Sequence, residues 1–343
     1  MGECTKETAF EILDTFKELG GNFIDTANGY QDGESELWLG EWMTSRKNRD
    51  ELVLATKYSG TCIPHMKDKV QANFCGNGTK SMRLSVESSL ERLQTSYVDL
   101  LYVHWWDYAT PIPELMRSLN ALVESGKVNY LGISDTPAWV VAKANQYARD
   151  HGFAPFVVYQ GLWNASIRDF ERDIIPMCKD EGMGLVPYGT LGQGCFQTEA
   201  AFKERQVNNP GRQKKPKRNE RAISKVLEAL SNEKNTRLTG VAMAYVMNKA
   251  PYVFPLVGCR TSEQLKSNVE ALNIDLNDDE IAEIENAYYF DPGFPHTFLS
   301  GTLFNNDDTV QEVPHGPGDV WLTNAITNID WVEPSKPIKP VHS

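Results

Sequence analysis

The sequence lacks the marks of a disulfide-rich, membrane-spanning or nucleic-acid-binding chain. Its six cysteines form no Cys-x-x-Cys pair and no ladder of disulfide spacings. No apolar run approaches the roughly 18 residues of a membrane span, and no early segment has the layout of a signal peptide. The formal net charge of −12 disfavours contact with nucleic acid or anionic membranes. We expect a cytoplasmic protein with reduced thiols, no metal and a small-molecule partner.

What the chain does have is a regular alternation of helices and strands. After a helix over 5–19, strands are expected at 22–25, 51–57, 97–103, 128–133, 155–160, 183–187 and 252–257. The helices between and after them are expected at about 34–45, 80–93, 113–125, 136–150, 169–181, 219–249 and 262–271. Near-continuous apolar strands are typical of a parallel sheet covered by helices. The pattern predicts an α/β fold, a (β/α)8 TIM barrel that lacks its first barrel strand.

The length fits one barrel domain over residues 1–290. Residues 203–221 form a basic insertion with eight Lys or Arg and two acidic residues. We interpret it first as a solvated loop, then as a lid that attracts an anionic cofactor, and last as a nuclear-localisation signal. Residues 291–343 show no periodicity and are expected as an irregular tail, its first part over the barrel mouth and its last dozen residues disordered.

Four reactive side chains follow the ends of three successive expected strands. Asp25 and Tyr30 follow the first strand, Lys57 ends the second, and His104 ends the third. In a barrel these strand ends meet at one mouth. Each residue alone would most often be structural, but a shared face favours a common function. Lys57 could supply the cation that favours the Tyr30 phenolate, and Asp25 could hold the lysine charged.

This set suits carbonyl reduction, in which a nicotinamide delivers hydride while Tyr30 gives a proton to the developing alkoxide. His104, when neutral, could orient the carbonyl oxygen. Tyr58, Trp105 and Trp106 lie beside these residues in sequence and could stack on a flat aromatic substrate, although core packing is equally compatible with them.

A Rossmann site for the nicotinamide is not expected, because Gly189-Thr-Leu-Gly192-Gln-Gly194 has the wrong spacing for the Gly-x-Gly-x-x-Gly fingerprint. The alternative is the loop after Val186 together with the start of the helix after Val257. There the segment 258–264 places backbone N–H groups and Arg260 at a helix N-terminus, which suits a phosphate. An additional phosphate bound by Arg260 would favour NADPH over NADH.

Three motifs resemble the aldo-keto reductase superfamily: Asp25-Thr-Ala27 with Tyr30, Ala55-Thr-Lys57, and Tyr102-Val-His104. The likeness runs from about residue 5 to about residue 295. It looks closest to fungal aryl-alcohol dehydrogenases, a group that includes the norsolorinic acid reductases of polyketide mycotoxin pathways.

The resemblance implies a barrel that binds NADP(H), with Tyr30 as proton donor, Asp25 and Lys57 tuning it, and His104 placing the substrate carbonyl. It also implies that Asp25 and Asp135 are among the cofactor contacts, that Ser134 and Gln160 hold the nicotinamide amide, and that Tyr188 stacks beneath the ring. The implied pyrophosphate loop is Gly189, Thr190, Leu191, Gly192, Gln193 and Gly194, and the implied 2′-phosphate and adenine contacts are Arg260, Gln264 and Asn268.

The chain departs from that family at three places. Asp135 stands where many relatives carry Asn, the phosphate loop is followed by the basic insertion, and no counterpart of the family's N-terminal hairpin and first barrel strand precedes Thr5. The leading expectation is an NADPH-dependent reductase of aromatic aldehydes or ketones in fungal secondary metabolism. The alternatives are an NADPH-binding regulatory subunit without significant turnover, as similar barrels form beside potassium channels, and an inactive, N-terminally shortened reductase. The sequence defines neither the oligomeric state nor the physiological direction.

Overall fold

The computed structural model describes residues 4–63, 66, 68–208, 215–304, 313–314, 319–326, 332 and 335–340. The described chain divides into two compact units. The N-terminal unit contains Cys4–Gln160 and Asp180–Met183, and the C-terminal unit contains Gly161–Lys179 and the chain from Gly184 onward. Each unit is described by itself.

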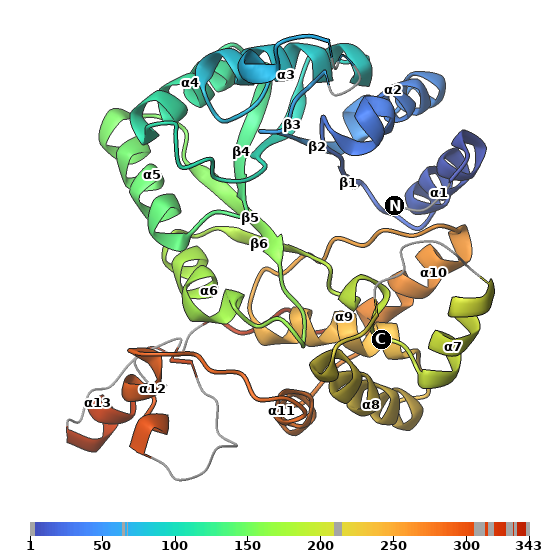
Figure 1. The fold of residues 1–343 in the computed structure, drawn as a ribbon, viewed down its shortest axis with the longest axis vertical. Coiled ribbons are helices and arrows are strands. Elements are labelled where there is room, and N and C mark those ends of the chain that lie inside the picture. Colours follow the sequence, from blue (N-terminus) through green and yellow to red (C-terminus); the bar gives the residue numbers. More distant parts are fainter. Residues whose placement is uncertain are drawn as a thin grey trace. The chain divides into compact units, whose positions relative to one another are not determined.

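The N-terminal unit contains parallel strands with helices in the connections. The strands are β1 (Phe23–Asp25), β2 (Val53–Tyr58), β3 (Val98–Val103), β4 (Val128–Ser134) and β5 (Phe156–Leu162), and each pairs in parallel with the next. The helices are α1 (Lys6–Glu18), α2 (Glu34–Arg46), α3 (Thr79–Leu93), α4 (Ile112–Glu124) and α5 (Ala138–His151). Figure 1 shows α3, α4 and α5 along one face of these strands. The expected alternation therefore exists here, with element bounds within about three residues of those expected.

Alternating side chains on β2 explain how this sheet meets its helices. Thr56 points toward α2, where its hydroxyl donates to the buried carboxylate of Glu36 at 2.5 Å. Lys57, the next residue, points to the opposite face because successive side chains of a strand alternate. Gly40 allows α2 to lie close to the end of α3, since a Cβ there would stand 2.3 Å from the Arg92 carbonyl oxygen. Glu36 also pairs with Arg92 of α3, at 2.6 Å.

The C-terminal unit is mainly helical. It contains the end of β5, β6 (Gly184–Tyr188) and most of α6 (Phe170–Asp180). The helices that follow are α7 (Glu199–Asn208), α8 (Arg218–Glu233), α9 (Leu238–Lys249), α10 (Ser262–Glu270), α11 (Asp278–Asn286), α12 (His296–Leu299) and α13 (Trp321–Ile326). β6 comes next to β5 in the strand order, which gives six strands in the described part of the chain.

The strand expected at 252–257 is reduced to one bridge, between Val253 and Leu185 of β6. Backbone bonds continue on both sides of it, with Phe254 N donating to Leu185 O and Leu256 N to Pro187 O, both at 2.8 Å. In a regular parallel ladder, the backbone nitrogen at position 187 of β6 would donate a hydrogen bond to the 252–257 segment. Pro187 has no N–H and cannot donate it. The proline in β6 therefore prevents a regular seventh strand.

The helical region expected at 219–249 is two helices, because Asn235 adopts a left-handed φ of 49° between α8 and α9. The expected series had no helix at 278–286. Asn277 and Glu280 form the capping box that begins α11, and this pattern is readable in sequence.

In the basic insertion, α7 reaches Asn208 and α8 begins at Arg218. Positions 209–214, in the middle of that insertion, lie outside the described residues. So does much of the tail expected at 291–343, within which α12 and α13 are short helices. The expectation of a single barrel domain over 1–290 stays a prediction.

None of the helices in the described ranges is long and apolar enough to cross a membrane.

Candidate active site and cofactor cavity

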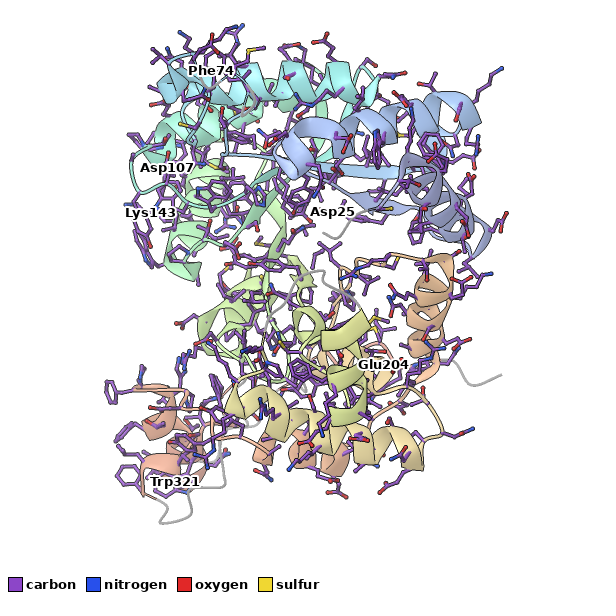
Figure 2. The ribbon with its side chains drawn as sticks, turned by 45° about the vertical axis from the view of Figure 1, so that its right-hand side comes forward. Asp25, Phe74, Asp107, Lys143, Glu204 and Trp321 are labelled. Carbon is purple, nitrogen blue, oxygen red and sulfur yellow. The ribbon has the colours of Figure 1, made fainter. Side chains whose placement is uncertain are left out.

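The residues expected at the site fall into two groups, one in each unit. In the N-terminal unit they occupy consecutive strand ends: Asp25 ends β1 (Figure 2), Lys57 is the penultimate residue of β2, His104 follows β3, Ser134 ends β4, and Gln160 is near the end of β5. Parallel strands present their carboxyl ends at the same edge of a sheet. The topology thereby brings five separate segments to one edge.

Asp25 and Lys57 form a buried ion pair. The Lys57 ammonium contacts Asp25 Oδ2 and donates to the Thr26 carbonyl oxygen at 2.7 Å, while Gln160 Nε2 donates to Asp25 Oδ1 at 3.0 Å. The Lys57 side chain is 0% exposed and that of Asp25 is 10% exposed. Burial lowers the pKa of Lys57, and the Asp25 charge opposes that shift. The lysine is therefore a fixed cation only while its carboxylate partner is present.

Tyr30 lies beside this pair. The turn after β1 is fixed by Asn28 N donating to Lys57 O at 3.1 Å and Tyr30 N to Ala27 O at 3.2 Å. The Tyr30 ring centroid lies 5.2 Å from Lys57 Nζ. Burial, with the charges of Asp25 and Asp135, raises the pKa of Tyr30 to about 12.

This direction differs from the expected stabilisation of a phenolate by Lys57. The lysine is paired with Asp25, and that negative charge disfavours a second anion on Tyr30. In this structure Tyr30 is a neutral phenol near pH 7, and a neutral phenol can donate a proton.

His104 completes this group. Its ring centroid lies 5.9 Å from that of Tyr30 in an edge-on arrangement, and its backbone N–H donates to the Tyr58 carbonyl oxygen at 2.9 Å. Burial, and then the charge of Lys57, lower the pKa of His104 to about 4. The imidazole is accordingly neutral at pH 7, and one of its nitrogens is a donor to a carbonyl oxygen.

The lowered pKa of His104 predicts a loss of stability in mild acid. A histidine whose pKa falls on folding stabilises the native state above its ordinary value of 6.5, and this contribution is lost as the pH falls toward 4. Between pH 7.5 and pH 5, the free energy of unfolding should fall by about 2 kcal/mol more in the parent than in His104→Gln. Urea unfolding of both proteins at each pH measures the difference. Parallel pH dependence in the two proteins would contradict the assignment.

Ser134 presents a buried hydroxyl at the same edge. The hydroxyl has no hydrogen-bond partner among the described residues. Its backbone is held by Thr136, whose hydroxyl donates to Ser134 O at 2.8 Å, and Asp135 N donates to Gln160 O at 3.1 Å. Asp135 has a left-handed φ of 40°, a conformation that Asn and Asp adopt more readily than most residues. A buried hydroxyl without a partner costs free energy, so this position fits a group that hydrogen-bonds.

The C-terminal unit holds the second group, around a cavity of about 550 Å³. Of the residues expected to bind cofactor, the cavity is lined by Gly189, Thr190, Leu191, Gln193, Gly194, Arg260, Gln264 and Asn268. Two residues of the expected 188–194 segment, Tyr188 and Gly192, do not line the cavity. The two loops expected to bind phosphate thus meet around one cavity within this unit.

The loop after β6 depends on glycine. Gly189 and Gly192 have φ of 70° and 64°, and a Cβ on Gly189 would stand 2.6 Å from the Leu162 side chain. Thr190 between them is buried, and its hydroxyl has no hydrogen-bond partner in the described part of the chain.

Across this cavity, Thr261 caps α10 by accepting from Gln264 N at 3.3 Å. Arg260 directly precedes that cap. A helix N-terminus, an adjacent guanidinium and an unpaired hydroxyl fit an anionic group such as a phosphate.

The aromatic residues expected to contact substrate differ in exposure. Tyr58 is buried, and its hydroxyl donates to Asn77 O at 3.2 Å, so here it packs as a core residue. Trp105 is 41% exposed and its ring centroid lies 4.9 Å from that of His104. Asn77 fixes this loop by donating to Trp105 O at 3.1 Å. Trp106 packs edge-on against Tyr108, with 6.4 Å between the ring centroids.

Tyr102 is a residue near the ion pair to which the sequence reading gave no role. Its ring centroid lies 5.6 Å from Lys57 Nζ, and the side chain is fully buried. The period of two along a strand places Tyr102 on the same face as His104.

The comparison with protein families decides which proteins this chain is related to. The model of the Aldo/keto reductase family matches residues 1–289. The chain belongs to the aldo/keto reductase family. This reductase is therefore an oxidoreductase with an α/β fold.

Named relatives extend the likeness over nearly the whole chain. Norsolorinic acid reductase B of Dothistroma septosporum is 64% identical over 99% of this chain and 86% of its own length. Norsolorinic acid reductase B of Aspergillus parasiticus is 61% identical over 99% of this chain and 89% of its own length. A probable aryl-alcohol dehydrogenase of Saccharomyces cerevisiae is 51% identical over 87% of this chain and 93% of its own length. The resemblance stated from the three motifs is thus confirmed.

Proposed function

We propose that this reductase uses NADP(H) to reduce an aromatic aldehyde or ketone, and in reverse oxidises an aryl alcohol. One observation carries the proposal: the neutral Tyr30 phenol lies beside the buried Asp25–Lys57 ion pair and the neutral His104 ring. A carbonyl that gains hydride needs a proton donor and a neutral hydrogen-bond donor at its oxygen.

The chemistry that we assign to these residues is a proton transfer. When bound, the nicotinamide supplies a hydride to the carbonyl carbon. The carbonyl π electrons then form an alkoxide, which takes the proton from the Tyr30 hydroxyl. His104 orients the carbonyl oxygen by donating a hydrogen bond. The Lys57 cation beside Tyr30 offsets part of the cost that burial and Asp25 place on the phenolate left there, and Asp25 keeps the lysine charged.

Each unit offers its own set of contacts to the cofactor. In the N-terminal unit, the Ser134 hydroxyl and the Gln160 amide would hold the nicotinamide carboxamide, near Asp25 and Asp135. In the C-terminal unit, Arg260 and Thr190 would hold phosphate groups, and Tyr188 is a further proposed contact. The remaining proposed contacts are Gly189, Leu191, Gly192, Gln193, Gly194, Gln264 and Asn268. The unpaired hydroxyls of Ser134 and Thr190 support this assignment.

The aromatic substrate class rests on Trp105 and on the relatives' names. Trp105 is exposed beside His104 and offers a flat surface for an aromatic ring. Trp106 is the second proposed contact, and Tyr58 would support the pocket wall. The names norsolorinic acid reductase and aryl-alcohol dehydrogenase favour an aromatic carbonyl compound and a role in fungal secondary metabolism such as mycotoxin synthesis.

The direct test is oxidation of NADPH by the purified chain with a panel of aromatic and aliphatic aldehydes. Turnover should be faster with aromatic aldehydes, and the Trp105→Ala variant should narrow this preference. NADPH binding without turnover of any aldehyde or ketone would favour the regulatory subunit instead. Failure to bind NADPH would overturn the cofactor assignment.

The Arg260→Ala variant tests the preference for NADPH. Removal of a charged hydrogen-bond donor to phosphate should raise the Kd for NADPH by about 10- to 100-fold and leave that for NADH within about twofold. Fluorescence titration with both nucleotides measures this. Lys266→Ala removes the same charge from an exposed position of α10 and serves as the control. Equal weakening of both nucleotides by Arg260→Ala would contradict the assignment.

A further inference from the structure

Tyr102 lies on β3 directly between a lysine of one neighbouring strand and a glycine of the other. Its Cα is in register with that of Lys57 on β2 and that of Gly132 on β4. A Cβ on Gly132 would lie 2.5 Å from the Tyr102 ring, so the ring covers the place where a β4 side chain would stand. The missing side chain at Gly132 therefore makes room for the aromatic ring.

The ring supplies Lys57 with a second aromatic neighbour. Lys57 Nζ lies 5.2 Å from the Tyr30 ring centroid and 5.6 Å from the Tyr102 ring centroid. A cation within about 6 Å of an aromatic centroid is attracted by the ring's quadrupole, and more strongly where water is excluded. Because the Lys57 side chain is fully buried, its charge depends on the groups around it.

The Tyr102 hydroxyl contributes less than the ring. It faces the Asp25 carboxylate and the Gln160 amide, yet makes no hydrogen bond of ordinary geometry with any described residue. Burial, and then the Asp25 charge, raise the pKa of this phenol well above its usual value. The hydroxyl stays neutral, and the ring is the part of the side chain that acts on Lys57.

We propose that Tyr102 is a positioning residue, whose ring over Gly132 holds Lys57 as a buried cation against Asp25. Its consequence for catalysis rests on the proposed function, whereas its effect on Lys57 needs no turnover. The other groups whose charge or ring acts on Lys57 are Asp25 from β1, Glu36 from α2, Asp135 after β4, His104 after β3 and Tyr30 after β1. The carboxylates of Asp25, Glu36 and Asp135 already favour the charged form of Lys57, and the Tyr102 ring adds to this stabilisation.

The test is a direct titration of the Lys57 side chain by NMR in protein with isotope-labelled lysine. The Lys57→Met variant identifies its signal. In Tyr102→Leu, which removes the ring, the Lys57 pKa should fall by about one pH unit. In Tyr102→Phe, which keeps the ring, it should stay within a few tenths of a unit. A parent-like pKa in folded Tyr102→Leu, or an equal fall in both variants, would overturn the proposal.

Two further variants separate this effect from a general loss of packing. Leu100→Ala removes a side chain from the same buried cluster, which also contains Ala55, and should leave the Lys57 pKa unchanged. Gly132→Ala keeps Tyr102 but displaces its ring, and should lower the pKa even if Tyr102→Leu fails to fold. An unchanged pKa in Gly132→Ala would contradict the proposal.

The catalytic consequence is read from the pH profile of kcat. In Tyr102→Leu, the apparent pKa of kcat that is due to Lys57 should be lower than in the parent, as in the NMR titration. In Tyr102→Phe it should be unchanged. If the parent reduces no carbonyl compound, the proposed function fails, yet the titration still tests Tyr102.

Discussion

Tyr30→Phe will lower kcat for an aromatic aldehyde by about 10³-fold, within the range of roughly 10²- to 10⁴-fold that a positioned proton donor contributes. The pKa of Tyr30 is raised to about 12, so the phenol holds its proton through the neutral range and can give it to an alkoxide. The variant keeps the ring beside Lys57 and loses only the transferable proton. The Kd for NADPH should stay within about twofold, because the lost interaction belongs to the transition state.

Steady-state NADPH oxidation and nucleotide titration measure the two quantities separately. Tyr97→Phe is the matched control, because its exposed hydroxyl bonds Asp50 at 2.9 Å, away from the ion pair. That control should keep parent turnover. Turnover of Tyr30→Phe within threefold of the parent would remove Tyr30 as the proton donor.

Asp25→Asn will destabilise the protein by about 3–5 kcal/mol, since it leaves the fully buried Lys57 without its counter-ion. The lysine would then lose its proton, because burial already lowers its pKa and the opposing carboxylate is gone. Lys57→Met should lower the free energy of unfolding by a similar amount, because it leaves the Asp25 carboxylate without its counter-ion. Urea unfolding at pH 7.5 gives both changes, and kcat should fall in both variants.

The double variant Asp25→Asn/Lys57→Met separates stability from catalysis. It leaves no uncompensated charge and should be more stable than either single variant, while its turnover remains lost. The exposed pair Asp14–Arg46, 2.7 Å apart, is the control, because breaking it should cost less than about 1 kcal/mol. Additive losses in the Asp25/Lys57 double variant would show that the two side chains do not act as a pair.

Local patterns were enough to predict where the N-terminal unit places its reactive side chains. The short apolar runs before Asp25 and before His104 define strands, and parallel strands between helices bring their ends to one edge. The position of Tyr30 five residues after Asp25 placed it in the loop after β1, and backbone bonds at Asn28 and Tyr30 form the turn there. Asp25, Lys57 and Tyr30 were found because each lies within a few residues of a strand end.

Local patterns failed where two distant segments decide the outcome. The residues 252–257 read as a strand, but Pro187 on the neighbouring β6 cannot donate the bond that a ladder requires. Tyr102 was identified in the sequence only as part of the Tyr102-Val-His104 motif, because its register with Gly132 and Lys57 depends on how three strands align.

The sequence by itself determined the α/β alternation, the family and the residue types at the strand ends, because these follow from hydrophobic periodicity and short motifs. Only the tertiary structure decided the charge states. The pKa of Tyr30 rises because the phenol is buried and near the charges of Asp25 and Asp135, and the pKa of His104 falls because it is buried and near Lys57. Burial and the distances between charges set these values, and both arise from chain segments far apart in sequence.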